Sequence, residues 1–301
     1  MLKELLQSEF PELMVKLIHC SDGQIVDDLQ LCEVAIAIYK LMSEIKPNDP
    51  YPLARIAEAY HLRGELREAG HFYQQVLELD PPSSLTNKEE EKVMKYAPIL
   101  YTTEKECFDL LDVVAIHHPS KPLIAYHLFW EDDYDYPDDY EPCDHEQIWV
   151  EYDEETEEVL KVSSFVHGRI ITTQESADEA NANNGRPLIR IEWGKHASLL
   201  KGWESLKDPQ TGRTIRDMLR ETYEHVKQGG RIPDHPLKRL WPNGFDGTWE
   251  DYTNFSIVID TQDFLKKKRF MAQSYWSNAV IQQYFLRYNF HPKYDWPFET
   301  K

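Results

Sequence analysis

The chain has 301 residues, of which 41% are hydrophobic and 12% aromatic, a composition that excludes a disordered chain and suffices for two domains. Its net charge of -20 argues against a nucleic-acid partner, because binding to phosphates normally needs a basic face. No apolar run is long enough to span a bilayer, no secretory signal is readable at the N-terminus, and the four cysteines form no CxxC pair. We therefore expect a reduced, cytoplasmic protein without a transmembrane segment.

Residues 35–47 and 69–81 match at a spacing of 34 residues. The matched pairs are Ala35 with Ala69, Ile38 with Phe72, Tyr39 with Tyr73, Ile45 with Leu79, and Pro47 with Pro81. This order of small, aromatic and proline positions resembles tetratricopeptide repeats, over residues 19–85. We expect tetratricopeptide-like helical hairpins within a domain at residues 1–95, with Gly64 in a turn and Pro81 after a helix.

This resemblance implies that the repeats bind a protein or peptide partner in a concave groove. An alternative is that they are a structural appendage that packs on the rest of the protein. Two repeats are marginal alone, because each repeat buries its apolar face on a neighbour. Residues 1–18 and 87–96 are therefore expected to act as caps.

The pattern changes after Pro98, where short apolar or alternating segments predict strands. The predicted strands are 99–101, 112–116, 123–130, 147–152, 159–167, 188–193 and 255–260. Residues 178–186 predict a loop, 213–228 a helix that ends at Gly229, and 275–286 an amphipathic segment. The expected fold is α+β: N-terminal helical hairpins, then an antiparallel β-sandwich with C-terminal helices at residues 96–301.

Residues 131–158 contain 15 aspartates and glutamates and no lysine or arginine. They form either a solvated acidic face or a cation site. Asp144 and Glu146 are two apart at a strand start and should point the same way. His167 and His196 follow the ends of other strands, and in an antiparallel sheet a strand start lies beside its neighbour's end. These four residues predict a metal site.

The chemistry expected there depends on the ligands. Imidazoles together with carboxylates would favour a transition metal, whereas carboxylates alone would favour Mg²⁺ or Ca²⁺. In a catalytic version, Asp144, Glu146 and His167 hold the metal, His196 is a ligand or general base, and a metal-bound water is the nucleophile.

The order of five short motifs gives a second resemblance. The motifs are Tyr96–Ile99, Leu123–Trp130, Asp144–Val150, Ser164–Gly168 and Gly194–Ser198. Residues 96–200 resemble the necrosis- and ethylene-inducing-like proteins and the vacuolar-protein-sorting-type β-sandwich domains. The resemblance implies that Asp144 and Glu146 bind a divalent cation, with Asp133 as a further ligand; Asp132 or Asp135 are alternatives. Glu141 stands where the family has a histidine, and could still be a ligand.

Two other functions stay open on the sequence. The protein could be a non-catalytic adaptor whose repeats bind one partner while the sandwich contacts another. Alternatively, aromatic residues near the C-terminus could line a small-molecule pocket. These residues are Trp276, Tyr284, Phe285 and Tyr288.

Overall fold

The computed structural model describes residues 25–134, 143–208, 211–229, 242–268, 270–285 and 290–297. The chain divides into two compact units. In its described part, unit 1 contains residues 25–83, 273–285 and 291–297, and unit 2 contains the remainder. This division differs from the predicted domains at 1–95 and 96–301, because the helix at residues 87–95 belongs with the strands and the C-terminal segment belongs with the N-terminal helices.

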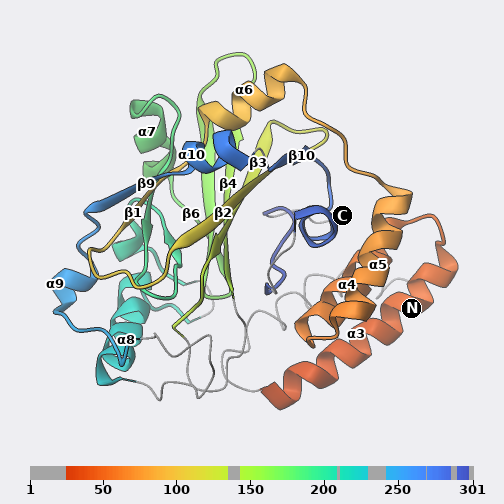
Figure 1. The fold of residues 1–301 in the computed structure, drawn as a ribbon, viewed down its shortest axis with the longest axis horizontal. Coiled ribbons are helices and arrows are strands. Elements are labelled where there is room, and N and C mark those ends of the chain that lie inside the picture. The colour runs from red at the N-terminus through yellow and green to blue at the C-terminus, as the bar shows by residue number, and fades with distance from the viewer. Residues whose placement is uncertain are drawn as a thin grey trace. The chain divides into compact units, whose positions relative to one another are not determined.

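The N-terminal part of unit 1 is helical, as predicted. Its helices are α3 (Ile25–Ile45), α4 (Pro50–Leu62) and α5 (Leu66–Leu79) (Figure 1). Asp49 caps α4 by accepting a hydrogen bond from the backbone N–H of Tyr51. Gly64 makes the turn before α5 with a φ of +73°, which glycine adopts without strain. Ala57 and Ala69 are fully buried, and their small side chains let α4 and α5 approach closely.

The C-terminal segment of unit 1 contacts α5. Its helix α11 (Ser277–Val280) continues into a π-helix, η2 (Ile281–Phe285), and both contact α5. Trp276 is 1% exposed whereas Tyr284 is 62% exposed, so these two predicted pocket residues do not share one environment. Tyr288 lies outside the described residues.

Unit 2 begins with α6 (Asn87–Lys95), which Thr86 and Glu89 start through a capping box. Its strands form two sheets (Figure 1). The order in the first sheet is β8 (Ser198–Leu199), β7 (Leu188–Ile191), β1 (Ile99–Thr102), β9 (Ile257–Asp260). The order in the second is β10 (Met271–Gln273), β2 (Leu110–His117), β3 (Leu123–Trp130), β4 (Asp144–Tyr152), β5 (Val159–Val166), β6 (Arg169–Thr172).

The strand directions differ in part from the sequence prediction. Strands β2 to β6 pair in an antiparallel way along the chain, as expected. Strand β1, however, pairs with β7 in a parallel way, so the four-stranded sheet is mixed and not antiparallel throughout. The chain between β1 and β7 contains β2 to β6, and parallel neighbours need such a long connection.

The main apolar core of unit 2 draws on both sheets. Leu128 and Trp130 of β3 and Ile148 of β4 belong to it, together with Leu100 of β1 and Ile189 of β7. Because side chains alternate along a strand, Asp144 and Glu146 share the Ile148 face of β4 and lie at one end of this core.

One segment predicted as a loop, residues 178–186, is helical over its first half. Thr173 caps helix α7 (Gln174–Ala182), because its side chain accepts a hydrogen bond from the backbone N–H of Ser176. Ala177 and Ala180 form its buried face, and a stripe of alanines is a weak hydrophobic signal in the sequence.

The helix predicted at residues 213–228 is present as α8 (Ile215–Gln228), with Gly229 at its C-terminal end. The other short helices of unit 2 are η1 (Trp203–Ser205), α9 (Trp249–Tyr252) and α10 (Thr261–Lys268). Among the described helices of the whole chain, none is long and apolar enough to cross a bilayer.

Candidate functional site

Two carboxylates bind the imidazole of His196 in unit 2. Asp144 begins β4, and His196 lies in the turn between β7 and β8 with a φ of +51°. The Nδ1 atom of His196 is 2.8 Å from Oδ2 of Asp144, and its Nε2 atom is 3.4 Å from Oε1 of Glu106. The structure therefore brings together Asp144 and His196, two of the predicted site residues.

His196 is an imidazolium at neutral pH. Burial would lower its pKa, but the charge of Glu106 and the hydrogen bond to Asp144 raise the pKa to about 10. Burial would likewise raise the pKa of Glu106, but the charge of His196 and hydrogen bonds from His196 and from backbone N–H groups lower it. The indole of Trp130 stacks on His196 at a ring-centroid distance of 4.2 Å, a geometry in which an aromatic face stabilises a cation.

His167 belongs to a second polar group. Its Nε2 atom is 2.6 Å from Oε2 of Glu192, a fully buried residue. The hydroxyl of Tyr252 donates a hydrogen bond of 2.8 Å to Oε1 of the same carboxylate. The two groups meet at the β7–β8 turn, where the backbone N–H of His196 donates to the carbonyl of Glu192. The structure thus pairs His167 with Glu192, where the sequence predicted a contact with Asp144.

The remaining predicted ligands have different surroundings. Glu146 is 5% exposed and lies opposite Leu128 of β3, on the same strand face as Asp144. The Oδ1 atom of Asp133 is 3.7 Å from Nζ of Lys195, which forms an ion pair with it. Glu141 lies outside the described residues.

The side chains fit one class of cation better than another. Both ring nitrogens of His196 face carboxylates, at 2.8 Å from Asp144 and 3.4 Å from Glu106, which disfavours His196 as a ligand of a transition metal. The carboxylates of Asp144 and Glu146 suit an oxygen-preferring cation such as Mg²⁺ or Ca²⁺. Within the described ranges, no three or more histidines, cysteines or acids are grouped so as to hold an ion.

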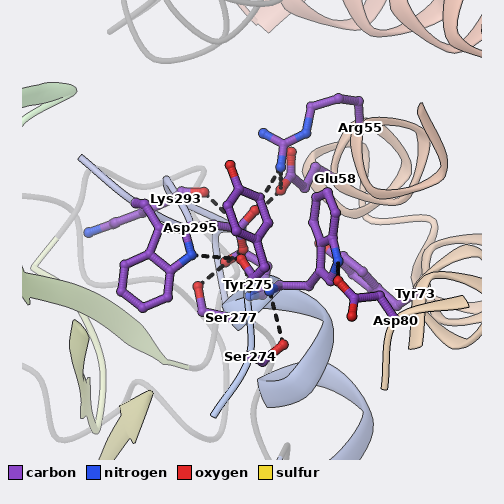
Figure 2. Close-up of polar contacts among 12 residues, drawn as sticks. Arg55, Glu58, Tyr73, Asp80, Ser274, Tyr275, Ser277, Lys293 and Asp295 are labelled. Atoms are coloured by element: carbon purple, nitrogen blue, oxygen red, sulfur yellow. Dashed lines mark hydrogen bonds and ion pairs between the residues drawn. The ribbon is translucent and has the colours of Figure 1, made fainter. Parts of the chain in front are cut away.

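Unit 1 contains a buried ionic group that the sequence did not predict (Figure 2). The guanidinium of Arg55 in α4 lies 2.9 Å from Oε1 of Glu58 and 2.7 Å from Oδ2 of Asp295. The amide of Asn278 also donates to Oε1 of Glu58. Burial raises the pKa of Glu58 to about 8, an effect that Arg55 opposes and the negative charge of Asp295 increases.

This raised pKa predicts that unit 1 loses stability as the pH rises. Below the ordinary pKa of Glu58 near 4.5, both the folded and the unfolded chain hold its proton; between there and about 8 only the folded chain does. At about 1.4 kcal/mol per pKa unit, we expect a loss of about 3 kcal/mol between about pH 5 and pH 7. Denaturant titrations across this range should show the slope in the wild type.

Glu58→Gln should flatten this slope, because the amide keeps an acceptor for Asn278 and Arg55 without titrating. Glu78→Gln is the matched control, since Glu78 is an exposed carboxylate on α5 and should leave the slope unchanged. An equal slope in the wild type and in Glu58→Gln would contradict the assignment.

Sequence reasoning missed Glu106, Trp130, Glu192 and Tyr252 as partners of the two histidines. Two of them lay near the ends of predicted strands: Trp130 is the last residue of the strand predicted at 123–130, and Glu192 is the second-last of the strand predicted at 188–193. Glu106 lies in an irregular stretch between β1 and β2, where no periodicity marks a buried residue. Comparisons of the chain with family models, with curated proteins and with solved structures found no match.

Proposed function

We propose that unit 2 binds a divalent, oxygen-preferring cation through the carboxylates of Asp144 and Glu146. The observation that carries this proposal is the pair of largely buried carboxylates on one face of β4, one of which is already oriented by His196. The single positive charge of the His196 imidazolium faces both Asp144 and Glu106, so it offsets only part of the negative charge of these acids and Glu146. A divalent cation would offset more of this charge with the ligands that Mg²⁺ and Ca²⁺ prefer.

The residues around the two carboxylates have supporting roles in this proposal. His196 donates a hydrogen bond to Asp144 and fixes its carboxylate, as partners of metal-binding side chains commonly do. Trp130 covers one face of the imidazolium and excludes water from it. A bound cation would supply positive charge that can polarise a water molecule or a substrate oxygen. If the site is catalytic, unit 2 is a β-sandwich enzyme that uses the bound cation to activate water for hydrolysis.

Cation binding should raise the melting temperature of the wild-type protein after treatment with a chelator. At a concentration of Mg²⁺ or Ca²⁺ about 100 times the dissociation constant, binding to the folded state alone stabilises it by about 2.7 kcal/mol. Glu146→Gln should abolish the shift, because it removes a ligand charge while the ion pairs of His196 with Glu106 and Asp144 stay in place. Thermal unfolding with and without each cation makes the measurement.

Glu151→Gln is the control for this experiment. Glu151 lies on the same strand, but its side chain is 43% exposed and faces Lys161 at 3.8 Å. This variant should keep the full cation-dependent shift. A wild-type protein whose melting temperature is the same with and without both cations would rule the proposal out.

Unit 1 supports a second proposal, a non-catalytic adaptor in which tetratricopeptide-like hairpins bind polypeptide. The supporting observation is that side chains of the C-terminal segment make specific contacts with Arg55 of α4, Gly70 of α5 and Asp80 after α5. This proposal does not need a cation in unit 2. A melting temperature insensitive to cations would therefore leave it standing.

A further inference from the structure

An imidazole, a carboxylate and a phenol form a chain of hydrogen bonds in unit 2 that the cation proposal does not use. The Nε2 atom of His167 is 2.6 Å from Oε2 of Glu192, and the hydroxyl of Tyr252 is 2.8 Å from Oε1 of the same carboxylate. Burial and the negative charge of Glu192 raise the pKa of Tyr252, so its hydroxyl keeps its proton and donates. The carboxylate of Glu192 is therefore held at both oxygens.

This chain fixes the tautomer of His167. An ionised carboxylate only accepts hydrogen bonds, so the Nε2 atom of His167 carries a proton and donates it to Glu192. When the imidazole of His167 is neutral, its unprotonated nitrogen is therefore Nδ1. A buried carboxylate on one ring nitrogen, with proton transfer at the other, is the arrangement that orients the catalytic histidine of many hydrolytic enzymes.

The imidazole of His167 lies between this buried carboxylate and the solvent. The side chain of His167 is 17% exposed, whereas that of Glu192 is 0% exposed. The neighbouring imidazolium of His196 is fully buried and has carboxylates at both ring nitrogens. Of these two histidines, His167 is thus the one that a molecule arriving from the solvent can contact.

The backbone at His167 gives no reason of its own for a histidine. Val166 pairs with Arg169, so His167 and Gly168 are the two central residues of the turn between β5 and β6. Their φ angles of +43° and +79° are those of a type I′ turn, for which Asn-Gly is the preferred sequence. An asparagine would therefore suit the turn better, and the side-chain bond to Glu192 is what distinguishes the histidine.

We propose that His167 is a general acid–base residue of unit 2, with Glu192 and Tyr252 as its positioning residues. The Nδ1 atom removes a proton from a water molecule, whose electron pair forms the new bond to the electrophilic carbon of an ester. The bond from that carbon to the leaving oxygen then breaks, and His167 returns the proton to this oxygen. This role goes beyond the cation proposal and holds whether or not Asp144 and Glu146 bind a cation.

The first test is nitrogen-15 NMR of the histidine side chains in the wild-type full chain, at a pH at which the imidazole of His167 is neutral. The expected tautomer has its proton on Nε2. His167→Asn identifies the signal by removing it, and should keep the turn because Asn-Gly suits it. A neutral His167 with its proton on Nδ1 would overturn the proposal, and this result does not depend on how any variant of Glu192 folds.

The second test is acylation by diethyl pyrocarbonate, which modifies unprotonated imidazole nitrogens. Mass spectrometry measures the rate at His167 relative to His71, an exposed histidine on α5. Glu192→Gln should lower this relative rate by about tenfold or more, because the amide no longer holds the ring in one tautomer. Tyr252→Phe, which removes only a hydroxyl, should lower it in the same direction.

Two internal controls accompany this measurement. Glu151→Gln changes an exposed carboxylate on β4 and should leave the relative rate at His167 unchanged. His196 is fully buried and should stay unmodified as long as each variant is folded. The proposal is overturned if His167 is not acylated in the wild type, or if folded Glu192→Gln and Tyr252→Phe are acylated there as fast as the wild type.

Discussion

Arg55→Met should lower the free energy of unfolding of unit 1 by about 3–5 kcal/mol, the usual cost of breaking a buried ion pair by removing one partner. Arg55 is the cation that contacts both Glu58 and Asp295, and the side chains of all three are at most 11% exposed. Without it, Asp295 loses the guanidinium at its Oδ2 atom, while its hydrogen bonds to Ser277 and Asn278 remain. Methionine fills similar volume, so the lost charge and not a cavity dominates the effect. Hydrogen exchange at the amides of α4 and α5 measures this unit separately.

Neutralising the acids should reverse most of the loss. In the Arg55→Met background, Asp295→Asn removes the carboxylate left without its guanidinium, and Glu58→Gln replaces an acid that holds its proton in the folded state below about pH 8. Together these two changes should restore most of the stability. Lys46→Met is the surface control: its ion pair with Asp49 is 3.8 Å long and the lysine is 52% exposed, so at most about 0.5 kcal/mol should be lost. If the free energy of unfolding of Arg55→Met is within about 1 kcal/mol of the wild-type value, the ion pairs of Arg55 with Glu58 and Asp295 do not stabilise unit 1.

The sequence predicted local elements better than it predicted which segments meet. Helices α4 and α5 follow from the 34-residue match, with Gly64 and Pro81 marking a turn and an end. Strand β3 coincides with the predicted strand at 123–130, because its apolar run is bounded by turn residues. The bond between Arg55 and Asp295 joins residues 240 positions apart, and no periodicity in either segment records it.

The site of unit 2 shows the same limit. Asp144 and His196, which the sequence placed in one candidate site, lie within hydrogen-bonding distance of each other, although their strands belong to different sheets. The strand-end argument itself concerned Asp144, Glu146 and His167. It placed His167 in the same group, but the carboxylate that binds His167 is Glu192. A sequence pattern shows which face a residue occupies on its own strand, whereas the partner depends on how two sheets pack, which the pattern does not contain.

His196→Leu should destabilise unit 2 by about 3–5 kcal/mol, measured at neutral pH in the presence of a chelator. The imidazolium is the cation between Glu106 and Asp144, and it is fully buried against Trp130. Leucine leaves both acids without this charge and removes the stacking partner of the indole. Because chelation excludes any contribution from a bound cation, the loss reports the internal ion pairs together with the stacking on Trp130. Denaturant unfolding followed by indole fluorescence provides the readout.

The companion variant separates charge from packing. Glu106→Gln and Asp144→Asn in the His196→Leu background remove the uncompensated charges, and should recover most of the loss if those charges cause it. Failure to recover stability would mean that the stacking on Trp130 and the shape of the β7–β8 turn hold this region together. Recovery would show that His196 acts as a built-in counter-charge. In that case the imidazole of His196 is protonated and pairs with Asp144. A divalent cation at Asp144 and Glu146 would then have carboxylate oxygens, and not an imidazole nitrogen, as its ligands.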